Sequence, residues 1–212
     1  MGIKERRERE REEVRTKILD AARELFATEG YEAVTMRKIA ERIEYSPTAI
    51  YLHFKDKESV LREICEVDFL SLAQNFGAIA RIADPVERLS ATGLAYAEFA
   101  VTHPNHYRLM FMTPHPPPDE ETEIRKGNPE EDAYAFLRET VAEAIAAGRL
   151  RPELDDAELV AQTMWAGMHG VVSLEIAKAK DDWVEWREIA MRTRLMNEVL
   201  IRGLVRNEGE GD

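Results

Sequence analysis

Apolar residues recur three and four positions apart through nearly the whole chain, which is the spacing that places them on one face of an α-helix. Ile18, Ala22 and Phe26 form such a stripe in the first helical segment. No segment alternates apolar and polar residues as a half-buried strand would. The sequence therefore predicts an all-α fold.

Local signals mark the expected helix ends. Gly30 suits the end of the first helix, Thr35 and Ser46 suit N-caps of two short helices, and Pro47 suits a first helical position. A long helix is expected from Asp56. Later helices are expected at 85–103, 105–112, 130–147, 156–179 and 182–205, with a proline-rich loop at 113–129.

Residues 35–54 hold two short helices joined by a tight turn, the arrangement of a helix-turn-helix. Ile39, Ile43 and Ile50 are expected to pack between the helices, with small Ala40 at their closest crossing. In this unit the second helix enters the major groove of DNA and the first lies across the backbone.

The side chains that face outward from this unit are candidates for DNA contact. Thr48 can bond a base edge or touch a thymine methyl, and Arg37 can reach a guanine edge. Tyr51 and His53 suit phosphate oxygens, and Lys57 lies beyond the second helix, where backbone contacts are expected. The candidate set is Thr35, Arg37, Lys38, Ser46, Pro47, Thr48, Ala49, Tyr51, His53, Lys55 and Lys57.

Residues 14–62 resemble the DNA-binding domain of the tetracycline-repressor (TetR) family. The matching positions are Gly30, Thr35, Ile39–Ala40, Ser46, Ile50–Tyr51, His53–Phe54, Lys57 and Leu61. Many positions at fixed offsets make this match specific. The resemblance implies DNA contacts at Arg37, Lys38, Pro47, Thr48, Ala49, Tyr51, His53 and Lys57.

One departure from the family pattern lies in the turn. Residues 42–46 contain no glycine, so a non-glycine residue is expected to take any left-handed conformation there, at a modest cost.

A second segment resembles the C-terminal domain named for its Trp-His-Gly motif in one TetR subgroup. It comprises residues 165–170, preceded by residues 106–111. Aromatic and methionine side chains with a few histidines suit a mainly apolar ligand, although the same side chains would also serve as core. The ligand-binding candidates are Phe99, His103, Tyr107, Met110, Phe111, Trp165, Met168 and His169.

The net charge of −12 is unevenly divided. Residues 1–57 carry 13 Lys and Arg against 12 Asp and Glu, and the remainder carries 16 against 29. The front of the chain can therefore bind phosphates if its basic side chains gather on one face. Residues 1–13 alternate Arg and Glu, which indicates a solvated extension of the first helix, with a DNA-contacting arm as the alternative.

Four segments follow from these patterns: residues 1–13 as a charged N-terminal extension of the first helix, 14–57 as the helix-turn-helix domain, 58–206 as a helical domain for ligand binding and dimerisation, and 207–212 as a flexible tail. The helices expected at 156–179 and 182–205 carry more apolar positions than one core needs. They are expected to form an isologous dimer interface.

Enzyme signatures are missing from the sequence. It has no Gly-x-Ser-x-Gly elbow, no glycine-rich phosphate loop and no His-Glu-x-x-His pattern, so no catalytic residue, cofactor or metal site is predicted. His103 and His106 lack a third ligand at matching spacing. Cys65, the single cysteine, is expected to be inert packing in the reducing cytoplasm. No apolar run approaches the roughly 18 residues that span a bilayer.

We therefore expect a cytoplasmic transcription repressor that binds a pseudo-palindromic operator as a homodimer. The resemblance implies that a small-molecule effector lowers operator affinity by favouring another conformation. The alternatives are a constitutive or activating DNA binder with the same fold, and an all-helical hydrolase or lyase.

Overall fold

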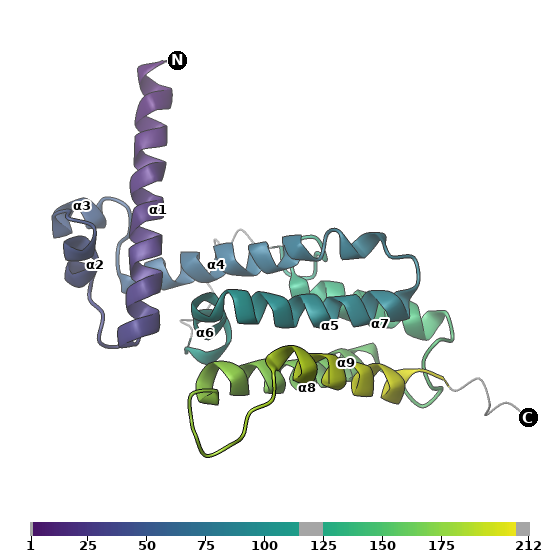
Figure 1. Cartoon of the computed structure of the whole chain (residues 1–212). Helices are drawn as coiled ribbons and strands as arrows, with labels where there is room; N and C mark the ends of the chain where they lie inside the picture. The colour runs from purple at the N-terminus through teal and green to yellow at the C-terminus, as the bar shows by residue number, and fades with distance from the viewer. Residues whose placement is uncertain (1, 115–124, 207–212) are drawn as a thin grey trace, which may run out of the picture. The chain divides into compact units, whose positions relative to one another are not determined.

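The structure is a computed structural model that describes residues 2–114 and 125–206. Over these residues the fold is all-α, as predicted from the sequence (Figure 1). The helices are α1 (Ile3–Glu29), α2 (Met36–Arg42), α3 (Pro47–Tyr51), α4 (Lys57–Asn75), the 3-10 helix η1 (Ile79–Arg81), α5 (Pro85–Thr102), α6 (Pro104–Met112), α7 (Ala133–Ala146), α8 (Ala157–Lys178) and α9 (Ile189–Leu204).

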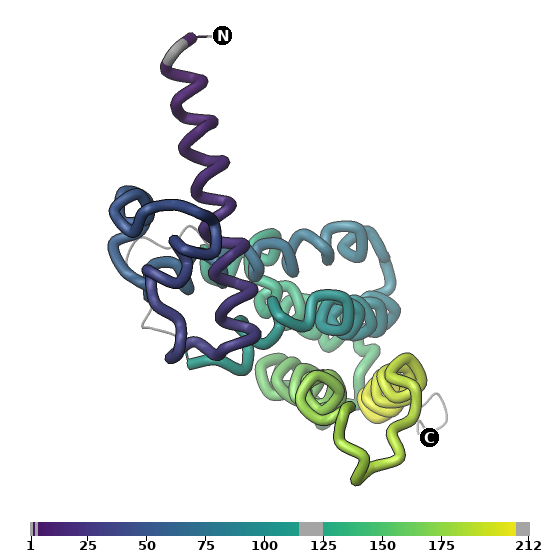
Figure 2. Tube along the Cα trace, turned by 60° about the vertical axis from the view of Figure 1, so that its left-hand side comes forward, coloured from purple at the N-terminus to yellow at the C-terminus, as the bar shows by residue number. Residues whose placement is uncertain are grey.

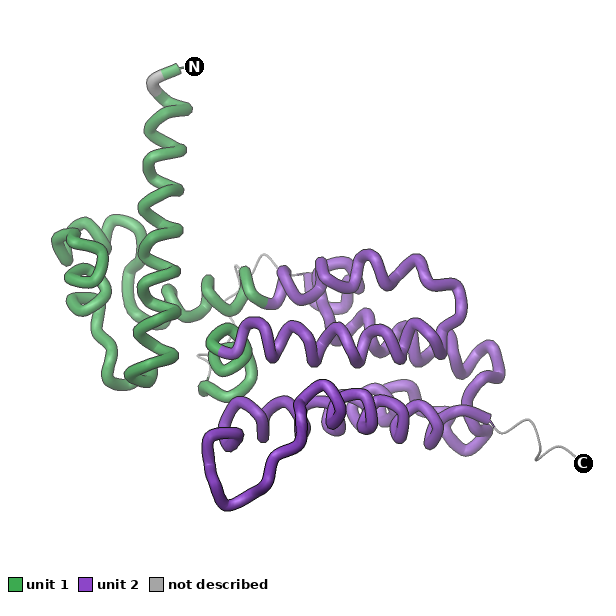
Figure 3. Tube along the Cα trace, viewed as in Figure 1, with its two compact units in different colours: residues 1–68, 105–123 green, residues 69–104, 124–212 purple. Residues whose placement is uncertain are grey.

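The chain divides into two compact units (Figure 3). Unit 1 comprises residues 1–68 and 105–123, and unit 2 comprises residues 69–104 and 124–212. This division does not test the four segments predicted from the sequence, whose limits stay a prediction. The tail at 207–212 and most of the proline-rich loop lie outside the described residues. No helix in the described ranges combines the length and hydropathy needed to cross a membrane.

Short polar side chains start most of the helices, as the sequence signals indicate. The Thr35 hydroxyl accepts from the Lys38 amide at 3.2 Å, and the Ser46 hydroxyl accepts from the Ala49 amide at 3.2 Å. Asp84 accepts from two amides in the first turn of α5, at 2.8 and 3.2 Å. These bonds satisfy donors that have no partner within the helix, which is why such residues fix a helix start.

The predicted start of the last helix is wrong. The sequence suggested a start at Asp181–Asp182, but α9 begins at Ile189. The Asp181 amide donates to the Lys178 carbonyl at 2.9 Å and its carboxylate lies 3.1 Å from the Lys178 ammonium, so Asp181 belongs to the turn that follows α8. Residues 182–188 form a non-helical connection, and its Trp186 ring lies with its centre 4.9 Å from the Arg192 guanidinium of α9.

Unit 1 is built on a small apolar core that α1, α2, α3 and α4 share. Ile18, Ile39, Ile50 and Ile64 are each fully buried, and every one of these four helices contributes one of them. A buried isoleucine contributes roughly 1.5–3 kcal/mol relative to an exposed one. The short helices α2 and α3 therefore owe their positions to the longer α1 and α4.

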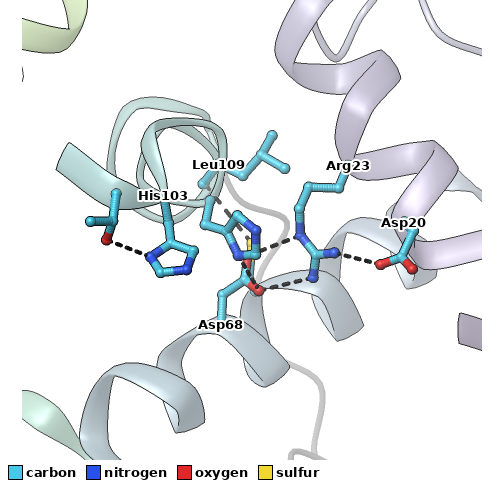
Figure 4. Close-up of polar contacts among 8 residues, drawn as sticks. Asp20, Arg23, Asp68, His103 and Leu109 are labelled. Carbon is cyan, nitrogen blue, oxygen red and sulfur yellow. Dashed lines mark hydrogen bonds and ion pairs between the residues drawn. The ribbon is translucent and has the colours of Figure 1, made fainter. Parts of the chain in front are cut away.

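A buried carboxylate adds a polar junction to unit 1 (Figure 4). Asp68 on α4 is 1% exposed and accepts from the Arg23 guanidinium of α1 at 2.9 Å. The same carboxylate lies 3.0 Å from Nδ1 of His106 on α6. Arg23 also bonds Asp20, which is exposed. Asp68 thus joins three helices, and its negative charge is balanced at close range.

In unit 2, α5 packs against α7, α8 and α9 around an apolar cluster that includes Leu89, Val141 and Met164. Two glycines let α9 approach its neighbours closely. A Cβ at Gly93 of α5 would lie 2.5 Å from Asn197 Oδ1, and a Cβ at Gly167 of α8 would lie 2.9 Å from Leu200 Cδ1. A Cβ at either position would force the facing side chain of α9 to shift.

Replacing the buried carboxylate should destabilise unit 1 strongly. Asp68→Ala leaves the Arg23 guanidinium buried without its main partner, a change that costs about 3–5 kcal/mol in comparable pairs. Asp20→Ala removes the exposed partner of the same arginine and should cost about 1 kcal/mol or less. Urea unfolding followed by circular dichroism measures both values. Equal losses for the two variants would show that Asp68 is not the supporting partner.

Candidate nucleic-acid interface

The turn between α2 and α3 is a Schellman motif built without glycine. The Tyr45 amide donates to the Ala40 carbonyl at 2.9 Å, and the Glu44 amide donates to the Glu41 carbonyl at 3.2 Å. Glu44 takes the left-handed position with φ of 60°, and it is the non-glycine residue with positive φ among the described residues. The sequence correctly predicted a left-handed non-glycine residue here, at a cost of roughly 1–2 kcal/mol.

Helix α3 has five residues and is anchored from one side. Ser46 caps its start, Pro47 occupies its first position, and Ile50 is fully buried. Phe54, just beyond the helix, is also buried. The opposite side of α3 is consequently fixed in space without contributing to the core.

The outward side of α3 carries the side chains that could read a duplex. Tyr51, the last residue of α3, is 55% exposed, and Leu52, directly after it, is 73% exposed. Pro47 and Thr48 are also exposed, whereas Ala49 is half-buried. A hydroxyl, a phenol and apolar atoms on one short helix match the contacts made in a major groove, where donors, acceptors and thymine methyls are displayed together.

Arg37 and Lys38 of α2 are exposed and hold surface ion pairs. Arg37 Nε donates to Glu41 at 2.9 Å within the helix, and Lys38 Nζ donates to Glu29 at 2.5 Å. Exposed pairs of this kind contribute about 0–1 kcal/mol, so a phosphate or base can replace the carboxylate at little cost. Lys55 is exposed after α3.

Three predicted candidates have structural partners in unit 1. The hydroxyls of Thr35 and Ser46 are occupied as helix caps. Lys57 Nζ donates to the Tyr31 carbonyl at 2.8 Å and lies 4.1 Å from the centre of the Tyr31 ring. The Lys57 contact holds the α1–α2 connection against the start of α4, a contact that sequence spacing gave no means of finding.

Arg15 of α1 supports the end of the reading helix, and sequence reasoning missed it. Its guanidinium donates to Glu63 Oε1 at 2.5 Å and to the His53 carbonyl at 3.1 Å, and it lies 4.4 Å from the centre of the Phe54 ring. Burial, followed by the nearby Arg11 and Arg15, lowers the pKa of His53 below its usual range. His53 is therefore neutral at neutral pH, and its buried Nδ1 has no partner among the described residues.

Unit 2 holds a separate polar group centred on Tyr96 of α5. The Trp165 indole N–H donates to the Tyr96 hydroxyl oxygen at 3.1 Å, and that hydroxyl lies 3.1 Å from Nδ1 of His169. Because an indole can only donate, the Tyr96 proton is available for His169 Nδ1. Burial lowers the pKa of His169, which keeps its imidazole neutral. Tyr96 was not among the predicted ligand residues, because its polar partners are distant in the sequence.

The predicted ligand residues are divided between the units. Phe99, Trp165, Met168 and His169 belong to unit 2, where Phe99 and Met168 are buried and Trp165 is 38% exposed. His103, in the same unit, is exposed and lies 2.8 Å from the Thr102 hydroxyl. The other three residues belong to unit 1, where each lies on α6: Tyr107, Met110 and Phe111.

The two histidines considered for metal binding have other polar contacts. His106 bonds Asp68, and His103 bonds the neighbouring Thr102 hydroxyl. Within residues 2–114 and 125–206, no three His, Cys, Asp or Glu side chains converge as metal ligands. Burial raises the pKa of the Cys65 thiol to about 12, so it carries no nucleophilic thiolate at neutral pH.

Two family patterns match the chain. Residues 18–64 match "Bacterial regulatory proteins, tetR family", and residues 89–193 match "Tetracyclin repressor-like, C-terminal domain". The first match contains most of the residues described on α2 and α3, and the second contains the Tyr96, Trp165 and His169 group.

Individual relatives agree with these matches. The chain is 30% identical to the transcriptional repressor KstR2 of Mycolicibacterium smegmatis over 153 residues, which cover 66% of this chain and 69% of that repressor. It is 32% identical to the regulator UidR of Escherichia coli over 92 residues, and this match spans 43% of the chain and 41% of UidR. The crystal structure of the TetR regulator PfmR of Thermus thermophilus shares the fold, with a TM-score of 0.69, 22% identity, and coverage of 90% of this chain and 96% of PfmR.

Proposed function

Because the chain belongs to the tetR family of bacterial regulatory proteins, we propose that it is a DNA-binding transcription repressor that a small, mainly apolar molecule releases from a pseudo-palindromic operator. The observation that carries the DNA-binding part is the outward face of α3. Exposed Thr48 and Tyr51 are held there by buried Ile50 and a rigid turn. A preformed reading surface loses little entropy on binding.

The residues divide by the part of DNA that they contact. Thr48 and Arg37 read base edges, whereas Tyr51, Lys38 and Lys55 contact phosphates. Thr35 and Ser46 act through their caps, which present backbone amides at two helix starts. Lys57 contacts a phosphate as well as holding Tyr31, and His53 contributes its backbone carbonyl to the contact with Arg15.

A homodimer would supply two reading helices for two half-sites. Helices α8 and α9 expose large apolar side chains, each between 49% and 64% exposed: Leu159, Leu174, Met191, Leu195 and Val199. Three of them follow one another at four-residue spacing on α9 and so share one face. An apolar stripe on each of two neighbouring helices suits an isologous interface of four helices.

Unit 2 is the proposed effector-binding part. Tyr96, Trp165 and His169 offer hydroxyl, indole and neutral imidazole groups beside buried Met168 and Phe99. Arg88, a buried cation on α5, is already bound to Glu143. A few neutral polar groups in an apolar setting suit an organic ligand with little charge. We also propose that residues 165–170 correspond to the motif of the Trp-His-Gly subgroup.

The DNA-binding proposal is tested on α2 and α3. Arg37→Ala should weaken binding to a duplex selected from a random pool by about 1–3 kcal/mol and relax specificity at one base pair. Tyr51→Ala should weaken binding without relaxing specificity. Neither variant should unfold more easily, because the Arg37 side chain is 79% exposed and Tyr51 is 55% exposed. Fluorescence anisotropy and thermal melts measure these effects.

Two controls separate the roles. Glu41→Ala removes the partner of Arg37 and keeps the cation, so it should preserve or improve binding. Lys57→Ala should weaken binding to every duplex, flatten the salt dependence and also lower the melting temperature, because Tyr31 loses its contact. If Arg37→Ala and Lys57→Ala had the same profile, the division into base and phosphate readers would be wrong.

The dimer is tested by placing charge on the α9 stripe. The wild-type chain should run at twice its mass of 24.3 kDa in light scattering at micromolar concentration. Leu195→Glu with Val199→Glu should give a folded monomer, since both positions are exposed in the single chain. Leu52→Glu adds charge at an exposed position just after α3 and should leave the dimer intact. A folded wild-type monomer at this concentration would refute the interface.

The effector is tested through the Tyr96 group. Hydrophobic aromatic or acyl compounds should raise the melting temperature, release DNA and change Trp165 fluorescence, with about 2.7 kcal/mol of stabilisation at 100 times Kd. Trp165→Ala should abolish release more than DNA binding, and Tyr96→Phe should weaken compounds that carry a polar group. Trp183→Phe, at a position 88% exposed, is the control. A screen in which only highly charged metabolites bind would contradict the proposal.

A further inference from the structure

The N-terminal part of α1 extends beyond the core of unit 1 (Figure 2). Its residues from Lys4 to Glu13 are exposed and all carry charge. The helix becomes part of the core only after this stretch, with Ile18 fully buried. These residues therefore add nothing to the apolar packing of the domain, and their arrangement needs another explanation.

The charges on this extension are sorted by face. Residues three or four positions apart share one side of a helix. Lys4, Arg7 and Arg11 follow that spacing and lead directly to Arg15 and then Ile18. The basic residues thus continue the face of α1 that packs into the domain. Glu8 borders this face and its carboxylate lies 3.9 Å from the Lys4 ammonium. The other sides carry two arginines against four glutamates: Arg6, Arg9, Glu5, Glu10, Glu12 and Glu13.

The two arginines at the centre of the basic face are available for a partner. Arg6 pairs with Glu10 and Arg9 pairs with Glu13, each four residues along the helix. Arg7 and Arg11 make no ion pair with any of the described residues. Intrahelical pairing therefore explains the presence of Arg6 and Arg9 but not that of Arg7 and Arg11.

The basic face points toward the end of the reading helix. Arg15, the next residue of the series, donates to the carbonyl of His53, which lies two residues after α3. Arg11 is near enough to His53 for its charge to lower the pKa of that imidazole. The unpaired arginines therefore lie on the side of α1 where α3 ends.

Helix stability does not account for the placement either. The start of an α-helix carries partial positive charge, so Lys4, Arg6 and Arg7 in the first turns of α1 are unfavourable there. Acidic residues would serve a merely solvated extension better. A polyanionic partner would make basic residues favourable at this helix start, because it neutralises their positive charge.

We propose that Arg7 and Arg11, with Lys4 beyond them, form a second DNA-binding strip that contacts the phosphates of the duplex next to the site where α3 docks. Arg7 and Arg11 lie about 6 Å apart along the helix axis at 1.5 Å per residue. Each strand of a duplex carries a phosphate about every 3.4 Å along its axis, so the two guanidinium groups meet different phosphates. The strip rests on the proposed function and adds affinity without sequence specificity.

The test compares two double variants of equal charge. Arg7→Ala with Arg11→Ala removes the unpaired arginines, and Arg6→Ala with Arg9→Ala removes the paired ones from the other sides of the same helix. Each full-length protein is titrated with the wild-type protein's selected duplex over a range of salt concentrations. The first variant should bind roughly tenfold more weakly at about 150 mM salt, and its log Kd against log salt slope should fall by about 3–4 for the four phosphates of a dimer.

The control variant should keep nearly all of the wild-type slope. Equal losses for both variants would show that only total charge matters and would overturn the strip. Unchanged binding for both would also overturn it and leave the extension as a solvated helix. Failure of the wild-type protein to bind any selected duplex is a different result, because it would overturn the proposed function itself. Circular dichroism checks that both variants keep their helix content, as exposed substitutions to alanine should.

Discussion

The proposed reading surface depends on a helix that is too short to form by itself. Isolated helices of fewer than about 12–15 residues are marginal in water, and α3 has five. Its conformation is imposed by the Ser46 cap, by Pro47 and by the full burial of Ile50. The positions of Thr48 and Tyr51 are thus determined by the side of the helix that never faces DNA.

Features that depend on neighbours in the chain could be predicted from the sequence. Thr35 and Ser46 act as caps because their hydroxyls need only reach an amide three residues ahead. The left-handed residue in the turn was predictable in the same way, since a Schellman motif requires one and residues 42–46 contain no glycine. The all-α class follows from periodicity alone.

Features that depend on distant partners could not be predicted. The contacts from Lys57 to Tyr31 and from Arg15 to His53 join residues 26 and 38 positions apart. Tyr96 has the spacing of a core residue, and only its bond to Trp165, 69 positions away, shows a polar role. The late start of α9 was also missed, because Asp181 bonds back to Lys178 in the turn after α8 instead of opening the next helix.

The glycine contacts of α9 have a mechanical consequence. Gly93 leaves room for the Asn197 amide and Gly167 for Leu200, so α5 and α8 each approach α9 closely at a glycine. Tightly packed interiors of this kind resist compression and transmit displacement. If α9 slid along its neighbours, the side chains of Asn197 and Leu200 would leave the glycines and meet the bulkier residues beside them on α5 and α8. Helices α5, α8 and α9 should therefore shift together as one rigid group.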